Sequence, residues 1–230
     1  MKSAKLANLL LNRYLSLSIC RFDKSKITTK ELLADYEKKR DFNKTTEPKP
    51  TYNENQLNKH RFVVQEHHAS NLHFDLRLES NGVMKRCVPK GPSLSPYKRR
   101  LAIMVEDHPI SYMNFEGKIP DGEYGAGEVR IWDSGTYEPL ENDGGDIDGS
   151  IEKGELTFRL YGKKLKGKFR MIRSRFGPNQ PKKQWLLLKT KDEFANQLFV
   201  LERILDYGSR RDLQTMKEKK PASTNKIKIT

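Results

Sequence analysis

Cysteine is scarce in this chain, whose 230 residues include only Cys20 and Cys87. With so few thiols and no Cys-x-x-Cys motif, the sequence excludes a disulfide-rich secreted fold and a cysteine-bound structural zinc, and it favours a reducing cytosol. The apolar stretch near the N-terminus is interrupted by Asn8, Asn12 and Arg13, so we expect no secretion signal. No run reaches the roughly 20 apolar residues that a membrane helix needs. We therefore predict a cytoplasmic, nucleoid-associated protein without a membrane partner.

Acidic residues are too few to balance the basic ones. Lys and Arg number 44 against 30 Asp and Glu, which gives a formal net charge of +14 and a pI near 9.6. Nucleic acid phosphates favour such a surface through counterion release, and anionic lipid would also attract it. The apolar fraction is only 35%, yet nine Tyr, ten Phe and two Trp are available for a core. The composition fits one ordinary domain with tails that recognises a polyanion.

Short alternating or apolar runs follow one another from residue 61 onward, separated by turn signals. We predict strands at Arg61–Glu66, Leu72–Glu79, Val83–Val88, Leu101–Glu106, Gly127–Asp133, Gly135–Glu138, Gly154–Leu160, Lys168–Ile172 and Gln184–Lys189. Asn81-Gly82 predicts a tight hairpin turn, because both residues accept positive φ. So many short strands with little helix between them indicate a mainly β fold, which we expect to be a compact antiparallel β-barrel.

Two helix-like stretches precede these strands, so we expect the barrel to carry short N-terminal helices. The first spans Ala4–Leu17. The second begins after Thr28 or Thr29 and runs to about Lys39, with Glu31 well placed in its first turn but without a full capping box. We expect three parts: a basic helical extension over residues 1–50, the barrel domain over 51–192, and a C-terminal extension with a basic tail over 193–230.

Two segments stand out by charge. Glu138–Glu155 holds seven acidic residues and one lysine, and we interpret it as an exposed loop. A calcium loop is the alternative, although the spacing matches no EF-hand. Gly162–Lys191 holds eleven Lys and Arg and no acid. Its charges are either the solvated face of strands or a surface that binds a nucleic-acid duplex.

All five histidines lie between residues 60 and 108, and the most informative stretch runs from His67 to Glu79. From residue 73 the alternation is regular, so a strand places Phe74, Leu76 and Leu78 on one face. The opposite face then carries His73, Asp75, Arg77 and Glu79. That face is either the water-exposed side of an amphipathic strand or a cluster whose side chains converge on one ion or phosphate.

A second histidine supports the cluster. His67 precedes a turn-like Ala-Ser-Asn stretch that can bring it back toward His73. Two His together with Asp75 can form a three-ligand site with open positions, which suits manganese, iron or zinc. Such a metal neutralises charge on a phosphoryl oxygen and lowers the pKa of bound water. Arg77 would lie beside the site, where a guanidinium can form a fork onto phosphate.

Two further motifs leave alternatives open. His108 follows Glu106-Asp107 and precedes Pro109, so it is either a structural residue at a strand end or a general acid or phosphate ligand. Gly122–Gly127 forms either a backbone nest for an anion or a plain hairpin turn. The hairpin is favoured, because the Lys and Ser/Thr that follow the glycines of a nucleotide-binding loop are lacking.

Several of these motifs, taken in order, resemble the 3′-phosphoesterase domain of bacterial and archaeal ATP-dependent DNA ligase D. The resemblance extends from about Asp35 to Lys191. It rests on residues 65–69 (QEHHA), 72–79 (LHFDLRLE), 88–92 (VPKGP), 105–109 (VEDHP), 115–120 (FEGKIP), 124–127 (YGAG) and 131–133 (IWD). No polymerase or ligase sequence accompanies these motifs, so we expect a free-standing member.

The resemblance implies a compact β-barrel enzyme that uses Mn2+ or another divalent transition metal. It implies action on a DNA primer-template or an RNA-DNA 3′ end. A terminal ribonucleoside would be removed by phosphodiester cleavage, and the remaining 3′-phosphate would then be hydrolysed to leave a 3′-hydroxyl for repair and ligation. Candidate partners are a separate DNA ligase, polymerase or end-binding protein, and we expect a monomer. The alternative is a catalytically silent nucleic-acid-binding module that docks on a repair ligase or polymerase.

The resemblance also assigns site residues by position. His67, His73 and Asp75 match the metal ligands, and Arg77 and His108 match the phosphate-contacting pair. The remaining matches are Tyr112, four residues after that histidine; Arg40, Asp41 and Glu47, at positions tied to the ribonucleoside step; and Gln65, Lys90 and Arg100, at accessory active-site positions. This chain departs from the family's pattern at Glu66, at His68 and at Arg86-Cys87.

Overall fold

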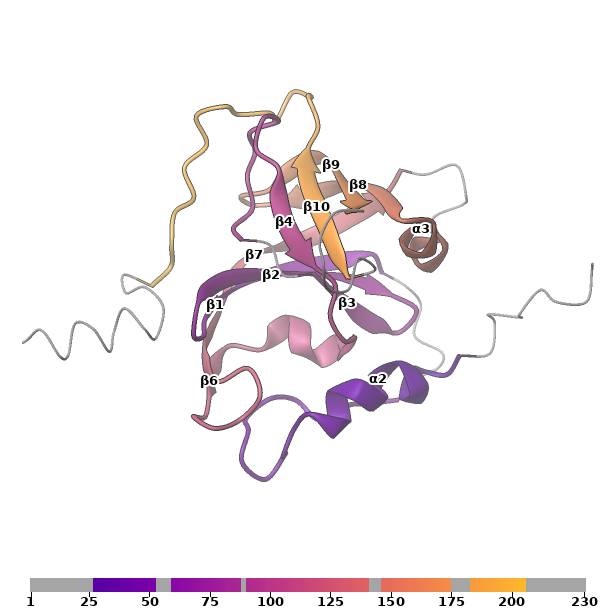
Figure 1. The fold of residues 1–230 in the computed structure, drawn as a ribbon, viewed down its shortest axis with the longest axis vertical. Helices are drawn as coiled ribbons and strands as arrows, with labels where there is room; N and C mark the ends of the chain where they lie inside the picture. The colour runs from indigo at the N-terminus through magenta and orange to yellow at the C-terminus, as the bar shows by residue number, and fades with distance from the viewer. Residues whose placement is uncertain (1–26, 53–58, 88–89, 141–145, 175–182, 206–230) are drawn as a thin grey trace, which may run out of the picture.

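Strands dominate the secondary structure (Figure 1). The computed structural model describes residues 27–52, 59–87, 90–140, 146–174 and 183–205. The strands are β1 Arg61–His68, β2 Leu72–Ser80, β3 Val83–Cys87, β4 Arg100–Ile103, β5 His108–Pro109, β6 Gly117–Ile119, β7 Gly127–Pro139, β8 Glu155–Gly162, β9 Lys166–Arg173 and β10 Gln184–Lys189. The helices that the structure describes are α2 (Thr29–Lys38), α3 (Ile147–Lys153) and the 3-10 helix η2 (Ile110–Asn114). The mainly β prediction is therefore confirmed.

The ten strands form one antiparallel sheet that stays open. Neighbours along it follow the order β4-β10-β9-β8-β7-β1-β2-β3-β5, with β6 added to β7. The predicted closed barrel is wrong, because the end strands β4 and β5 do not pair with each other in the described part of the chain. β5 meets β3 through only two residues. One of them is Pro109, which has no backbone N–H with which to extend the ladder.

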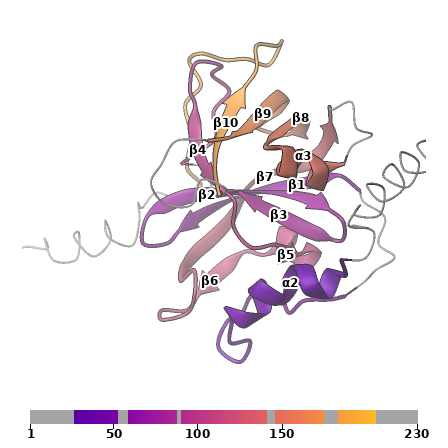
Figure 2. The same cartoon turned by 45° about the vertical axis from the view of Figure 1, so that its right-hand side comes forward.

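The sheet curls into two strand layers (Figures 1 and 2). The strands β4, β8, β9 and β10 lie over one face of β1, β2, β3 and β7, while α2 and η2 lie on the opposite face. The main core packs between the strand layers and takes Phe62, Val64, Phe74, Leu76 and Leu78 from β1 and β2. A second cluster on the helical side consists of Tyr36, Tyr112, Phe115, Ile119 and Val129. As a result, β1 and β2 are buried on both faces.

The long strand β7 joins the two layers. Its first part pairs with β1, and its last residues pair with β8. The sequence predicts two strands here, but the chain continues through Ser134 and Gly135 without a break. A Cβ atom at Gly135 would lie 2.2 Å from the carbonyl oxygen of Tyr161. Glycine is therefore required where β7 passes from one layer to the other.

Local turn and cap signals explain other boundaries. Asn81 (φ 48°) and Gly82 (φ 77°) form the tight turn between β2 and β3, as predicted. For α2 the sequence predicts no full capping box, but Thr28 and Glu31 form one. The capping box fixes where α2 begins.

Part of the acidic segment Glu138–Glu155 is helical, so the prediction of an exposed loop is wrong for α3. The Asp146 side chain accepts a hydrogen bond from the Gly149 N–H and caps the helix, and Gly154 ends it with φ 89°. Asp146 and Gly154, two of the acidic and glycine residues of this segment, are here helix caps. For the calcium alternative, the described residues of this segment contain no group of candidate metal ligands.

The basic segment Gly162–Lys191 contributes β9 and β10 to the outer strand layer, which consists of β4, β8, β9 and β10. Phe169 and Trp185 point into the main core, so Lys166, Lys168 and Arg170 of β9 lie on the opposite face. Lys189 of β10 is instead buried and pairs with Asp192. Arg170 pairs with Glu155 at 2.6 Å. Both alternatives for this segment, a solvated face and a duplex-binding surface, stay predictions.

The predicted helix Ala4–Leu17, Cys20 and the predicted basic tail lie outside the described residues. Among the helices that the structure does describe, none has the length and apolar character of a membrane span.

Glu66 and His68, two of the departures from the family's pattern, anchor a C-terminal segment to β1. Phe199 and Leu201 pack against the main core. The Trp132 indole N–H donates to the Glu202 carbonyl at 2.7 Å. Beyond it, the N–H of Ile204 donates to Glu66 Oε2 at 2.7 Å, while Glu66 Oε1 contacts His68 Nε2 at 2.5 Å. Residues 199–204 therefore cross the face of β1 that lies opposite the predicted site residues.

Replacing Glu66 with alanine is expected to lower the free energy of unfolding by about 1–3 kcal/mol, because the buried His68 ring and the partly buried Ile204 N–H lose their acceptor. The Glu66→Gln variant keeps one acceptor oxygen and should lose less. Thermal unfolding measures the first effect, and hydrogen exchange at the Ile204 amide measures release of the segment. Unchanged exchange in the alanine variant would contradict the anchoring role.

Candidate metal centre and phosphate site

The pairing of β1 with β2 brings predicted site residues onto one face of the sheet. His67 lies opposite His73, and Gln65 lies opposite Asp75. These side chains point away from the main core, but Asp75 is only 1% exposed because α2 and η2 cover this face. Arg77 is also 1% exposed. The interpretation as the water-exposed side of a strand is therefore wrong.

His67, His73 and Asp75 form the one group of candidate metal ligands within the described residues. Their ligand atoms all lie within 4.8 Å of one another. His73 Nε2 lies 3.6 Å from Asp75 Oδ1, and His67 Nδ1 lies 3.9 Å from Asp75 Oδ2. The two imidazole centroids are 4.6 Å apart. Two imidazoles and a carboxylate suit a divalent transition metal.

Backbone carbonyls orient both imidazoles. His67 Nε2 lies 2.8 Å from the Gly125 carbonyl oxygen, and His73 Nδ1 lies 2.8 Å from the Asn71 carbonyl oxygen. A ring nitrogen that faces a carbonyl must donate, so in each neutral ring the other nitrogen carries the lone pair. That nitrogen is the one near Asp75 in both residues. Because such contacts prepare histidine for metal binding, the residues present fit a divalent cation.

The hairpin between β6 and β7 supplies the Gly125 carbonyl. Its two turns are closed by hydrogen bonds from the Glu123 N–H to the Pro120 carbonyl and from the Ala126 N–H to the Glu123 carbonyl. Gly125 has φ 78°, which glycine adopts without strain. Of the two alternatives for Gly122–Gly127, the hairpin is confirmed, and its carbonyl faces a histidine.

Arg77 lies next to these ligands and is held on several sides. Its Nε donates to Gln65 Oε1 at 2.6 Å, and its Nη2 donates to Asp75 Oδ2 at 3.1 Å. The guanidinium carbon lies 4.3 Å from the ring centroid of Tyr112. Gln65 is itself fixed, since its amide nitrogen donates to the carbonyls of Tyr112 and Phe115. A buried positive charge is thus oriented beside the candidate metal ligands.

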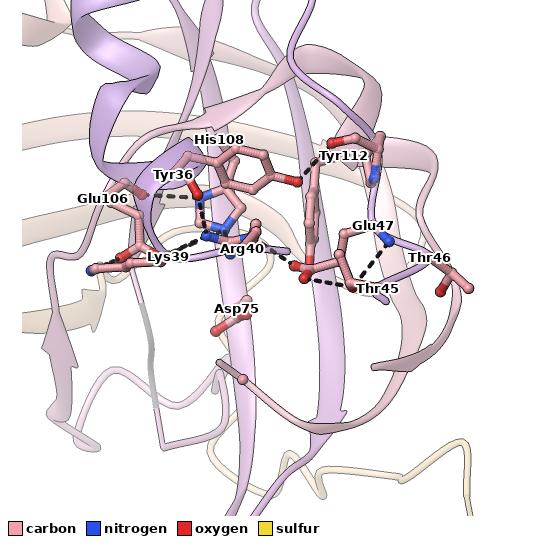
Figure 3. Close-up of polar contacts among 12 residues, drawn as sticks. Tyr36, Lys39, Arg40, Thr45, Thr46, Glu47, Asp75, Glu106, His108 and Tyr112 are labelled. Carbon is pink, nitrogen blue, oxygen red and sulfur yellow. Dashed lines mark hydrogen bonds and ion pairs between the residues drawn. The ribbon is translucent and has the colours of Figure 1, made fainter. Parts of the chain in front are cut away.

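A second arginine links the segment after α2 to His108 (Figure 3). Arg40 Nη2 lies 3.1 Å from His108 Nε2, and Arg40 Nε donates to Glu47 at 3.0 Å. Arg40 Nη1 lies 3.6 Å from Glu106 Oε1. Because arginine can only donate, His108 accepts at Nε2, and its Nδ1 donates to the Glu106 carbonyl at 3.0 Å. In this arrangement Nδ1 carries the ring proton and the lone pair of Nε2 faces Arg40.

Glu47 connects this network to Tyr112. Its Oε1 accepts from the Tyr112 hydroxyl at 2.8 Å as well as from Arg40, and its Oε2 accepts from the Thr45 hydroxyl at 2.9 Å. Glu47 is only 4% exposed, although it lies in a polar, proline-containing stretch. No periodicity marks such a residue, so only the family resemblance predicts a role for it.

Glu106, Tyr36 and Lys39 contact the same network and are not predicted from the sequence. Glu106 Oε2 accepts from Lys39 Nζ at 3.1 Å, and the Tyr36 ring lies 3.8 Å from the guanidinium carbon of Arg40. The sequence contains one signal for Glu106, which is its spacing from His108. Residues two apart in an extended segment point to the same side, and Glu106 stands two residues before His108. Tyr36 stands four residues before Arg40, a spacing at which helical neighbours meet. Lys39 had no local signal, because its contact with Glu106 spans 67 residues.

Burial and nearby charge shift pKa values around Arg40. Burial raises the pKa of the Tyr36 hydroxyl well above its usual range, against the opposing charge of Arg40. Burial alone would lower the pKa of Lys39, but its hydrogen bond to Glu106 and the charge of that carboxylate outweigh burial and raise it. Tyr36 therefore stays neutral and Lys39 stays positive at neutral pH.

The three other predicted residues are Asp41, Lys90 and Arg100, whose observed contacts are made elsewhere. Asp41 accepts from the Asn43 N–H at 3.1 Å, which lowers its pKa, and also pairs with Lys44. Lys90 is exposed, and its backbone N–H donates to the Leu101 carbonyl. Arg100 begins β4 opposite Leu187. Their roles in the site stay predictions.

Comparisons with known proteins agree on one family. Residues 65–173 match the model of the DNA Ligase D 3′-phosphoesterase domain. The multifunctional non-homologous end joining protein LigD of Pseudomonas aeruginosa is 48% identical over 170 residues, covering 72% of this chain and 19% of that protein. The LigD of Mycolicibacterium smegmatis is 42% identical over 168 residues, covering 70% of this chain and 21% of that protein. The chain thus spans about a fifth of the length of these curated relatives.

Proposed function

This chain belongs to the DNA ligase D 3′-phosphoesterase family, and from that premise we propose that it is a metal-dependent hydrolase that processes 3′ ends of DNA. The observation that carries the proposal is the group of His67, His73 and Asp75, of which only His73 is partly exposed, with Arg77 3.1 Å from the Asp75 carboxylate. A cation site beside an oriented guanidinium suits a phosphate ester, whose charge both neutralise.

The metal that we propose is Mn2+, with other divalent transition metals as alternatives. His67 Nδ1, His73 Nε2 and a carboxylate oxygen of Asp75 would hold it, because these atoms face one another while the outer ring nitrogens contact carbonyls. Bound there, the cation supplies positive charge next to the phosphoryl oxygens. Backbone carbonyls that accept from the rings have already fixed their orientations, so little reorganisation is needed on binding.

The chain's own residues would bind and orient the phosphate. Arg77 presents a guanidinium whose plane is set by Gln65, Asp75 and the Tyr112 ring. His108 would contact the phosphate through Nε2, the atom that Arg40 contacts in this structure. Once protonated there, the same nitrogen is the one from which a proton would pass to the leaving oxygen. The buried surroundings of both groups exclude water and strengthen their charge interactions.

The substrate that we propose is a DNA primer-template or an RNA-DNA 3′ end. A terminal ribonucleoside would leave first by phosphodiester cleavage, and the remaining 3′-phosphate would then be hydrolysed to a 3′-hydroxyl. The product would pass to a separate ligase or polymerase in non-homologous end joining, with this protein acting as a monomer.

Incubating the protein with Mn2+ and a primer that ends in one ribonucleotide tests the proposal. We expect a product shortened by one nucleoside, which first carries a 3′-phosphate and then a 3′-hydroxyl, and no product when a chelator is present. If the protein binds the primer but neither product forms, the hydrolase proposal fails and the silent binding module remains.

Replacing Glu47 with alanine is expected to reduce ribonucleoside removal roughly ten- to a hundredfold while leaving 3′-phosphate hydrolysis nearly unchanged. Arg40 and the Tyr112 hydroxyl lose their shared acceptor, whereas the candidate metal ligands keep all their contacts. The ratio of the two rates, measured on the two substrates separately, reports the effect.

The control for this variant is Glu193→Ala. Glu193 is an exposed carboxylate that pairs with Arg159 on the outer strand layer. Its replacement with alanine should leave the rates of ribonucleoside removal and of 3′-phosphate hydrolysis unchanged. Equal loss of both rates in the Glu47 variant, with thermal stability preserved, would contradict a role specific to the ribonucleoside step.

A further inference from the structure

Tyr124 is an exposed aromatic residue at the edge of the candidate site. It is 44% exposed, whereas Tyr36 and Tyr112, the other tyrosines of this region, are almost completely buried. Nothing in the packing of the fold requires a large aromatic ring here, since Tyr124 belongs to neither core cluster. An exposed ring beside a phosphate site is a candidate for contact with the rest of the substrate.

Tyr124 lies near both ends of the site, which are the candidate metal ligands and the cationic groups beside His108. The next residue, Gly125, provides the carbonyl that orients the candidate ligand His67. On the other side, Lys39 Nζ lies 4.8 Å from the centroid of the Tyr124 ring, and the guanidinium carbon of Arg40 lies 5.6 Å from it. Arg40 in turn contacts His108. The ring therefore lies between the candidate metal ligand and the cationic groups near His108.

The backbone that carries the ring is well defined. Residues 117–119 and 127–129 pair as β6 and β7, and two turn hydrogen bonds close the connection between them. Glu123 lies 3.9 Å from Lys44 in the segment after α2. A ring held in this way contributes stacking area at a low cost in conformational entropy.

We propose that Tyr124 is a stacking platform for a nucleobase next to the scissile phosphate. The inference rests on the proposed function and adds a positioning residue to it. Stacking suits an enzyme that trims ends of any sequence, because every base has a π face and stacking tolerates sequence change. Lys39, positive and 37% exposed in its side chain, lies beside the ring where a backbone phosphate of the same nucleotide strand would pass.

Two nucleotides flank the scissile phosphate, and either one offers a base. One is the terminal ribonucleoside, which is present only in the diester substrate. The other is the penultimate nucleotide, which is present in both steps. Either base would stack on the ring in the same way, so substrates with a single abasic position distinguish the terminal base from the penultimate one.

The kinetic test compares Tyr124→Ala with Tyr124→Phe on the natural substrate and on each abasic substrate. We expect the alanine variant to raise KM about tenfold with little change in kcat, because a base stack contributes about 1–3 kcal/mol. The phenylalanine variant keeps the ring and should behave like the original protein. On the substrate that lacks the stacked base, the alanine substitution should have no further effect.

A binding test separates this inference from the proposed function. An oligonucleotide with 2-aminopurine at the terminal or penultimate position is mixed with the full chain in the presence of a chelator, so that no hydrolysis is needed. We expect fluorescence quenching at one position with the original protein and with Tyr124→Phe, but not with Tyr124→Ala. Equal quenching by all three proteins, or an alanine effect that persists on both abasic substrates, would overturn the stacking role.

Discussion

Replacing His73 with alanine is expected to abolish both ribonucleoside removal and 3′-phosphate hydrolysis. His73 contributes one of only three candidate ligand atoms in the group, and its ring is already oriented by the Asn71 carbonyl. With two ligands left, a divalent cation should bind much more weakly, because no other candidate group exists within the described residues. Rates on the two substrates and Mn2+ affinity by calorimetry measure the effect.

His60→Asn is the matched control for this variant. His60 lies at the other end of β1, with its ring centroid 5.3 Å from that of Tyr137, and its positive φ of 48° is tolerated by asparagine. This variant also loses an imidazole but should keep both activities and the metal affinity. Full activity of the His73 variant would show that the ligand assignment is wrong.

Replacing Arg77 with lysine is expected to lower kcat by about 10²–10³-fold in both steps while Mn2+ affinity stays close to that of the original protein. Lysine keeps the positive charge but cannot reproduce the planar contacts to Gln65 Oε1, Asp75 Oδ2 and the Tyr112 ring. The charge therefore loses its orientation toward the phosphate. Kinetics on both substrates and calorimetry with Mn2+ together separate phosphate orientation from metal binding.

Arg61→Lys provides the control for the arginine variant. Arg61 also pairs with a carboxylate of β2, Glu79, at 2.7 Å, but it lies at the opposite end of β1 from the candidate ligands. Its replacement should leave both rates unchanged. If Arg77→Lys retains the original kcat, hydrolysis of the bound phosphate ester does not depend on an oriented guanidinium, and the role given to Arg77 is wrong.

The alternation of β2 was sufficient to predict which residues share a face. Phe74, Leu76 and Leu78 enter the main core, and Asp75 and Arg77 occupy the other side, because the period of two is a property of any extended strand. The approach of His67 to His73 also follows locally, since the two strands are joined by a short turn. This much of the site is encoded within 13 consecutive residues, from His67 to Glu79.

The residues that cover this face of β1 and β2 were not predictable in the same way. Arg40 and Glu47 reach His108 and Tyr112 across 68 and 65 residues of chain, and no local pattern specifies such contacts. The barrel prediction failed for a related reason: strand periodicity locates most of the strands but does not show whether the end strands meet. Here Pro109 ends the ladder at β5, and that consequence becomes visible only once its partner strand is known.

Crystals soaked with Mn2+ and measured at the manganese absorption edge test the central claim most directly. The account predicts one strong anomalous peak within coordination distance of His67 Nδ1, His73 Nε2 and an Asp75 carboxylate oxygen, and its loss in the His73→Ala protein. A peak at other residues, or none at a concentration of Mn2+ that supports hydrolysis, would contradict the assignment of this site as the metal centre.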